Sequence, residues 1–301
     1  MGVVIVGSMA FDTIHTPFDK RERVIGGSCI YASIAASLFD RTGIVGVIGD
    51  DFTEDHLKTL KERSIDTDGV IREKGKSFFW EGKYHLDMNT RDTITTELNV
   101  FENFDPVIPE SYKKIPYLFL ANIDPPLQLK VLESMEKPGF VLCDTMNLWI
   151  DIKKDELKKV FSKVDCVVLN DEEIRQFTGK PNLLQGAREI QKTGPAYVII
   201  KKGEHGASIL GPGSFYFSAP SYPVEGVIDP TGAGDSFAGA FIGYMAAKNK
   251  NSDTDIIKKA LVYGNAVASF TVEGFSIERL EQVSMRKIEG RIEAIRKISE
   301  F

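Results

Sequence analysis

The residues best suited to chemistry lie in one short stretch, 229–235, which reads Asp-Pro-Thr-Gly-Ala-Gly-Asp. The segment behind it has a helical period, because its bulky residues recur at positions 237, 241, 244 and 245. A glycine-rich turn that opens a helix directs free N–H groups and the positive end of the helix dipole at one point, where they favour an anion. Asp235 stands at that point. A carboxylate beside an anion site suits proton removal from a hydroxyl that attacks a phosphate.

A capped helix start is the simpler interpretation of the same stretch. An aspartate in the first turn stabilises a helix by about 0.3–1 kcal/mol without any further role. For an isolated Gly-Ala-Gly-Asp both interpretations stay open, so other parts of the chain must distinguish them.

Length and composition indicate an ordinary globular chain. It has 301 residues, 43% of them hydrophobic and 27% charged, which is enough for a large α/β core. The net charge of −6 argues against a nucleic-acid partner. The three cysteines form no CxxC pair and the four histidines lack metal-ligand spacing, so we expect neither disulfides nor a zinc site. Because no apolar run could span a bilayer and the N-terminus does not resemble a signal peptide, we expect a cytoplasmic protein without a membrane partner.

Buried strands alternate with helices along most of the chain. Continuous apolar runs at 3–6, 117–122, 140–144 and 164–170 are typical of strands buried on both faces of a parallel sheet. Such sheets bind ligands beyond the carboxyl ends of their strands. Four polar residues are expected at that edge: Asp12, Asp124, Asp144 and Asn170. The GxGxxG fingerprint of an NAD site is absent. Residues 255–270 read as two short helices with an alanine-rich apolar face.

The segment 69–101 departs from this pattern, because it is rich in β-formers and has no helical period. It predicts a β-flap outside the main sheet, and a flap of this kind excludes water from a reaction. Gly75-Lys76-Ser77 is not a P-loop, since position 70 is valine and a strand follows. Arg91, within the flap, could reach a substrate, but solvation at the surface is the favoured interpretation.

The run 229–235 resembles the C-terminal signature of the PfkB carbohydrate kinases, the ribokinase-like kinases, and weaker similarity extends from residue 3 to about 274. The resemblance implies that Gly232, Ala233 and Gly234 form an anion hole and that Asp235 is the catalytic base. It also implies a ribokinase-like, Rossmann-type three-layer sandwich with a mostly parallel central sheet. Residues 1–301 would form one domain, into which a small β-lid made of residues 13–25 and 75–100 is inserted.

The acceptor site is carried over from the same resemblance. Asp12 and the pair Gly26-Gly27 would hold hydroxyl groups of the acceptor, and Asp124 resembles a further acidic residue that touches it. The sequence departs from the family at Tyr31, where an asparagine is usual. Its ring would either stack on a sugar or base, or fill the space that the asparagine leaves.

The nucleotide site is implied in the same way. Asn170 and Glu173 match the Asn-x-x-Glu motif that handles Mg²⁺ and phosphate, with Glu173 acting on the metal indirectly through water. Asn170 with Glu173 also reads as a helix-capping box, and both roles can hold together. The remaining candidates for ATP contact are Gly203, Gly206, Thr231, Asn265 and Lys202, although a solvated lysine is an equally good interpretation of position 202.

The sequence thus predicts an ATP- and Mg²⁺-dependent kinase that phosphorylates an alcohol hydroxyl of a sugar, polyol or nucleoside. The resemblance also allows a monovalent cation such as K⁺ and a homodimer formed through the lid. The alternative is a non-catalytic sensor that binds nucleotide or sugar on the same fold. That alternative explains the missing asparagine, but it does not explain an aspartate placed in an anion hole.

Overall fold

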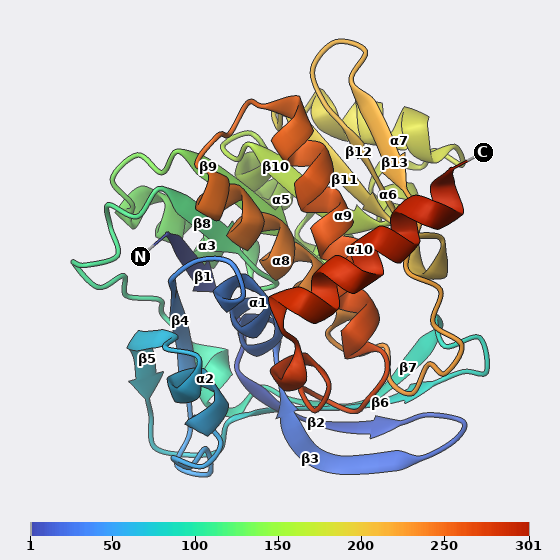
Figure 1. Cartoon of the computed structure of the whole chain (residues 1–301). Helices are drawn as coiled ribbons and strands as arrows, with labels where there is room; N and C mark the ends of the chain where they lie inside the picture. Colours follow the sequence, from blue (N-terminus) through green and yellow to red (C-terminus); the bar gives the residue numbers. More distant parts are fainter. Residues whose placement is uncertain (1, 301) are drawn as a thin grey trace.

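The computed structural model describes residues 2–300 and contains two β-sheets (Figure 1). The main sheet has nine strands in the order β13-β12-β11-β10-β9-β8-β1-β4-β5. In chain order these strands are β1 (Val3–Val6), β4 (Thr42–Ile48), β5 (Asp66–Arg72), β8 (Tyr117–Leu120), β9 (Phe140–Asp144), β10 (Cys166–Asn170), β11 (Tyr197–Lys201), β12 (Ala207–Leu210) and β13 (Tyr216–Ala219). All neighbours from β5 to β11 pair in parallel, whereas β12 and β13 are antiparallel. The predicted α/β class with a mostly parallel central sheet is confirmed.

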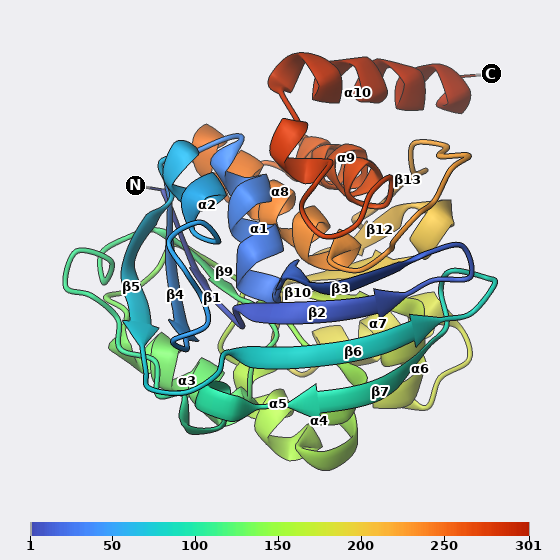
Figure 2. The ribbon, with the colours of Figure 1, turned by 90° about the horizontal axis from the view of Figure 1, so that it is seen from below.

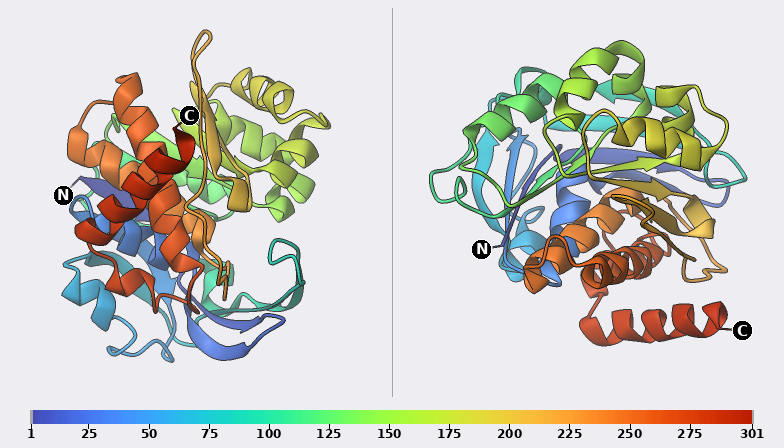
Figure 3. Two further views of the ribbon diagram at one scale, coloured as in Figure 1. Left: turned by 45° about the vertical axis from the view of Figure 1, so that its right-hand side comes forward. Right: turned by 90° about the horizontal axis from the view of Figure 1, so that it is seen from above.

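Helices cover both faces of the main sheet and give three layers (Figure 3). One face carries α1 (Ser28–Ser37), α2 (Lys58–Glu62), α8 (Ala233–Lys248), α9 (Thr254–Thr271) and α10 (Met285–Ser299). The other carries α3 (Pro125–Ser134), α4 (Asn147–Ile152), α5 (Lys154–Phe161), α6 (Asp171–Thr178) and α7 (Leu183–Gln191). Within β1, Val3 and Ile5 join the core of the first face, while Val4 and Val6 join that of the second. This alternation explains why buried strands read as unbroken apolar runs.

A small sheet of four strands lies apart from the main one, in the order β3-β2-β6-β7 (Figure 2). Its strands are β2 (Ala10–His15), β3 (Lys20–Gly26), β6 (Phe78–Tyr84) and β7 (Arg91–Glu97). Two hairpins build it, β2–β3 and β6–β7, and they join through the parallel pair β2–β6. We refer to these four strands as the small sheet.

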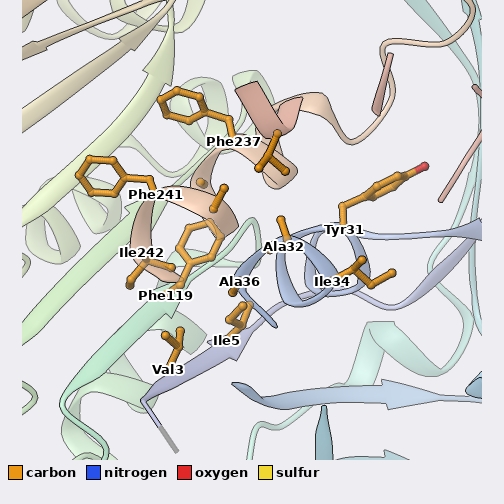
Figure 4. Packing of buried hydrophobic residues seen from close by; sticks show 14 of the residues in the cluster. Val3, Ile5, Tyr31, Ala32, Ile34, Ala36, Phe119, Phe237, Phe241 and Ile242 are labelled. Atoms are coloured by element: carbon orange, nitrogen blue, oxygen red, sulfur yellow. The ribbon is translucent and has the colours of Figure 1, made fainter. Parts of the chain in front are cut away.

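Helices α1 and α8 approach each other at main-chain distance. A Cβ on Gly239 of α8 would overlap the backbone of Ala32 in α1, and one on Gly243 would lie 2.8 Å from the Ala36 Cα. Figure 4 shows Ala32 and Ala36 on this side of α1, among the buried residues of the same cluster. Because only glycine permits this approach, the starting ends of the two helices are held at a fixed separation.

The structure corrects three expectations about the elements. Residues 254–271 form the single helix α9 rather than two short ones. β5 pairs with β4 in the main sheet, so the part of segment 69–101 before residue 73 does not belong to a flap. Asp12 does not follow a strand at the edge of the main sheet, but lies within β2 of the small sheet. Among residues 2–300, no helix is both long and apolar enough for a membrane span.

Candidate active site

The turn before α8 is fixed by its own aspartate. Asp229 is fully buried, and its carboxylate accepts hydrogen bonds from the Thr231 N–H (2.9 Å) and the Ser276 N–H (3.3 Å). Gly232 then takes a left-handed conformation (φ 75°) and precedes the first residue of the helix. The Ala233 N–H bonds to the Pro230 carbonyl at 3.2 Å. Within residues 2–300 the N–H groups of Gly232 and Gly234 have no acceptor, so these two amides are the ones available to an anion.

Asp235 lies half-buried in the first turn of α8. Burial, and after it the negative charge of Asp144, raises the pKa of Asp235 to about 7, against the opposing effect of Lys201. A carboxylate with a pKa near neutrality can accept a proton from a hydroxyl and can release it again at physiological pH. The simpler role of a stabilising charge at the helix start does not require this burial, since an exposed aspartate would serve equally well.

Lys201, at the end of β11, brings a positive charge to the same point. Its Nζ lies 3.3 Å from an Asp144 carboxylate oxygen, and a Cβ on Gly234 would lie 3.0 Å from it. Burial opposes its charged form, but the carboxylates of Asp144, Glu173 and Asp235 outweigh that effect and raise the pKa of Lys201. An ammonium group therefore stands beside the free amide of Gly234. The sequence pattern pointed to the neighbouring Lys202 rather than to this lysine.

Asn170 and Glu173 form the expected capping box at the start of α6. The Asn170 side chain accepts from the Glu173 N–H, and the Glu173 carboxylate accepts from the Asn170 N–H, both at 2.7 Å. Glu173 is buried, and this burial raises its pKa to about 7 despite the attraction of Lys201. Asp144, Glu173 and Asp235 thus surround one ammonium group, and the local excess of negative charge fits a divalent cation.

Direct metal ligation is not supported by the side chains alone. No group of three or more histidine, cysteine, aspartate or glutamate side chains within residues 2–300 is placed to hold a metal ion. Mg²⁺ in phosphoryl-transfer sites is held largely by phosphate oxygens and water, with few carboxylates. The residues present fit a Mg²⁺ ion that Glu173 reaches indirectly.

The structure brings together Asp12, Gly26 and Gly27, the residues predicted to hold the acceptor. A Cβ on Gly26 would overlap the Asp12 carboxylate, and the Gly27 N–H points to the same carboxylate. Asp12 is buried without an ion-pair partner in the part of the chain that the structure describes. Burial, then the charges of Asp229 and Asp235, raise the pKa of Asp12 to about 8. A buried carboxyl group of this kind is costly for folding and is suited to holding hydroxyl groups of a ligand.

This cost predicts that Asp12→Asn stabilises the protein. The folded state binds the proton of Asp12 more tightly than the unfolded state, where the pKa is near 3.8. The contribution of Asp12 to stability is therefore fully present below about pH 4 and is lost as the pH rises through about 8. At pH 8 we expect Asp12→Asn to raise the Tm by about 2–5 °C. The gain should shrink towards pH 5, and a lower Tm at pH 8 would contradict the assignment.

Tyr31 lies beneath the turn rather than open to a ligand. Its ring is 1% exposed, and a Cβ on Gly232 would overlap it. Its hydroxyl is buried without a hydrogen-bond partner among the described residues. Tyr31 therefore fills space under Gly232, the second of the two roles considered above.

Tyr84 of β6 connects the small sheet to the turn before α8, because its hydroxyl accepts a hydrogen bond from the Thr231 hydroxyl at 3.1 Å.

The remaining candidates for nucleotide contact lie around the β11–β12 turn. Gly203 and Gly206 both have positive φ (55° and 82°), which the tight turn requires. The Lys202 ammonium, unlike that of Lys201, lies 3.2 Å from the Ser218 hydroxyl of β13. Asn265 of α9 donates hydrogen bonds to the carbonyls of Ala219 and Pro220, which commits its amide group to the backbone.

Asp124 is committed elsewhere as well. Its carboxylate pairs with Lys153 at 2.6 Å, at the start of α3. Its second oxygen is buried without a hydrogen-bond partner among the described residues. No hydrogen bond among the described residues joins Asp124 to Asp12, and its place at the acceptor stays a prediction from the resemblance.

Comparisons with known proteins identify the family and the fold of the chain. Residues 3–278 match the model of the pfkB family carbohydrate kinases. A cytidine kinase from Thermococcus kodakarensis is 30% identical over 256 residues, which are 82% of this chain and 90% of that protein. The crystal structure of the Methanocaldococcus jannaschii nucleoside kinase, an archaeal member of the ribokinase family, has a TM-score of 0.78 at 19% identity, over 98% of this chain and 99% of that one.

A third relative shares the fold with nucleotide bound. A ribokinase II from E. coli, in complex with ATP and Mg²⁺, has a TM-score of 0.77 at 21% identity, over 97% of this chain and 99% of that one. The likeness to these structures confirms the ribokinase-like fold. Because the family model matches nearly the whole chain, the protein belongs to the pfkB family of carbohydrate kinases.

Proposed function

We propose that the protein transfers the γ-phosphoryl group of ATP, with Mg²⁺, to a hydroxyl of a nucleoside or sugar, and that Asp235 is the general base. The observation that carries this proposal is the position of Asp235, a half-buried carboxylate with a pKa of about 7 beside two free amides and the Lys201 ammonium. The Asp235 carboxylate accepts the proton of the acceptor hydroxyl. The two amides and the Lys201 ammonium stabilise the negative charge of the transferring phosphoryl group.

Each part of the chain has a separate task in this proposal. Asp12 accepts hydrogen bonds from hydroxyl groups of the acceptor, and the bare Gly26 and Gly27 let the acceptor approach the backbone. Asp235 then takes the proton of the attacking hydroxyl. Gly232 and Gly234 donate N–H groups to the transferring phosphoryl, while Glu173 holds water of the Mg²⁺ shell. Bound Mg²⁺ supplies positive charge at the phosphates.

The acceptor that we favour is a ribonucleoside, with cytidine as the first to test. This choice rests on the similarity to the cytidine kinase, the relative reported above with 30% identity. A sugar or polyol remains the alternative acceptor within the same reaction. Contact of Lys202, Gly203, Gly206, Thr231 or Asn265 with ATP, and of Asp124 with the acceptor, stays a prediction. So does a requirement for K⁺. For Tyr31 the burial favours the space-filling role over contact with the acceptor.

The test is ADP production from ATP and Mg²⁺ with separate acceptors: cytidine, uridine, adenosine, inosine, ribose and fructose. We expect at least one of these acceptors to give one ADP for each molecule of phosphorylated acceptor. Cytidine should be among the acceptors with the highest rates. A sensor would instead show a Tm raised by acceptor and by a non-hydrolysable ATP analogue, without any ADP. That outcome would refute the proposed kinase activity.

We also infer a cytoplasmic protein that pairs through the small sheet, without nucleic acid or membrane as partner. The outward side of β7 exposes Ile94, and Leu98 is exposed directly after this strand. Apolar side chains on an exposed edge strand suit contact with a second copy. Sedimentation at twice the chain mass of 33.5 kDa would support the dimer, and a monomer at micromolar concentration would exclude it.

A further inference from the structure

The β6–β7 hairpin of the small sheet spans both halves of the candidate active site. Near its turn, Tyr84 at the end of β6 receives the hydrogen bond from Thr231, close to the free amides of α8. At the turn itself, Asn89 reaches the nucleotide side, because a Cβ on Gly203 would lie 2.9 Å from the Asn89 amide oxygen. The same hairpin therefore contacts the turn before α8 and the β11–β12 turn.

The turn of this hairpin is ordered by its own side chains. The Asp87 carboxylate accepts from the N–H groups of Asn89 (3.0 Å) and Thr90 (2.9 Å) and from the Thr90 hydroxyl (2.7 Å). His85 and Asp92 bond across the turn at 2.9 Å. These contacts hold the first residue of β7, Arg91, in a defined place.

The strand register decides which way Arg91 faces. Arg91 is the direct cross-strand partner of Tyr84, and side chains of directly opposed residues leave an antiparallel pair on the same face. Tyr84 is buried against the body and points to Thr231, so Arg91 leaves the hairpin towards the active site as well. Lys83 and Asp92, the next pair along, leave on the opposite face.

Arg91 is exposed and uncommitted. Its guanidinium makes no ion pair or hydrogen bond to any side chain or carbonyl within residues 2–300. Its charge nevertheless acts on the site, because it lowers the pKa values of Asp235, Glu173 and Tyr84 against the stronger effect of burial. A free guanidinium that faces an anion site and lacks a protein carboxylate as partner is suited to phosphate oxygens.

We propose that Arg91 contacts the transferring phosphoryl group from the hairpin side, opposite Lys201. This inference rests on the proposed function and gives a catalytic role to Arg91, for which solvation at the surface was the favoured expectation. Two cations then enclose the phosphoryl group, Lys201 from the main sheet and Arg91 from the small sheet. Since Asn89 of the same hairpin touches the β11–β12 turn, the arginine is in place only when the small sheet lies over the site, which couples phosphoryl transfer to closure.

The test compares Arg91→Gln with Lys83→Gln in the full chain, using cytidine as the acceptor, or the best acceptor of the panel above. Both variants remove one positive charge from an exposed position of the same hairpin, but only Arg91 faces the site. We expect Arg91→Gln to lower kcat by about 10²–10³-fold. The KM for the acceptor and the Kd of a non-hydrolysable ATP analogue should change less than about threefold, because the contact strengthens only in the transition state. Lys83→Gln should retain the wild-type kcat.

Arg91→Lys serves as the second variant, since it keeps the charge but loses the planar pair of donors. We expect it to recover part of the lost kcat. A kcat of Arg91→Gln equal to that of Lys83→Gln would overturn the inference, and so would a rise in the acceptor KM alone, which would make Arg91 an acceptor-binding residue. If the wild-type protein gives no ADP with any acceptor, the proposed function fails together with this inference; an active wild type with an unaffected Arg91→Gln variant refutes this inference alone.

Discussion

Asp235→Asn is expected to lower kcat by about 10²–10⁴-fold while the Kd of a non-hydrolysable ATP analogue stays close to that of the wild type. The amide has nearly the same shape as the carboxylate but cannot take the proton of the acceptor hydroxyl. Removing a charge from a half-buried place whose pKa is raised to about 7 should also leave the fold intact or slightly more stable. Steady-state kinetics together with calorimetric titration of the analogue separates the two effects.

The pH profile provides the control for this variant. Because Asp235 must be ionised to act as a base, kcat/KM of the wild type should fall tenfold for each unit below about pH 7. The residual activity of Asp235→Asn should not show this acid limb if the limb belongs to Asp235. If Asp235→Asn has a kcat near the wild-type value, Asp235 is not the general base, whatever the shape of its pH profile.

Lys201→Met is expected to lower kcat by about 10²–10³-fold, since it removes an ammonium group beside the amide of Gly234. It should also raise the pKa of Asp235, because Lys201 is the largest effect that lowers this pKa. The acid limb of the pH profile should therefore move to higher pH. No such shift is expected from the loss of a phosphate contact alone, so the profile tests the position of the lysine independently of kcat.

Lys202→Met provides the comparison for this prediction. Its ammonium group lies at the Ser218 hydroxyl, one residue away from Lys201 along the chain. We expect a smaller loss of activity and an unchanged acid limb. Lys201→Met leaves the buried carboxylates of Asp144 and Glu173 without their cation, which costs about 3–5 kcal/mol of stability and can impair folding. Lys201→Arg keeps the positive charge and therefore serves as the second variant. If Lys202→Met has the larger effect, the assignment of the two lysines is wrong.

Much of the fold could be predicted from local signals. Strands such as Val3–Val6 are apolar at every position because both faces are covered, and this pattern directly predicts a parallel sheet with helices on both sides. The turn at 229–235 was equally readable, because glycines directly before a helical apolar period indicate a tight turn into a helix, and Gly232 has the positive φ of such a turn. The Asn170–Glu173 capping box has a spacing that specifies its hydrogen bonds.

Other parts depended on tertiary contacts that no local pattern contains. Two adjacent lysines, 201 and 202, look alike in the sequence, and their roles differ because a strand turns successive side chains to opposite faces. A signal was available, since the apolar run 197–200 ends at Lys201 and the end of a buried parallel strand lies at the carboxyl edge, where Asn170 was already expected. For Arg91 no such signal existed, because its direction depends on a hairpin register between Tyr84 and Arg91 that the sequence leaves open. β13 and the unbroken α9 were missed for similar reasons.

The contact of Gly239 and Gly243 with α1 has a consequence for how this enzyme can change during evolution. α1 begins directly after Gly27, which belongs to the proposed acceptor site, and α8 begins two residues before Asp235. The direct packing of the two helix backbones therefore fixes the distance between the proposed acceptor site and Asp235, and this distance does not depend on any side chain that could be exchanged. Substitutions on the small sheet can change the substrate preference while this distance stays constant. A single methyl group added at position 239 should conversely impair the enzyme towards every acceptor to the same degree.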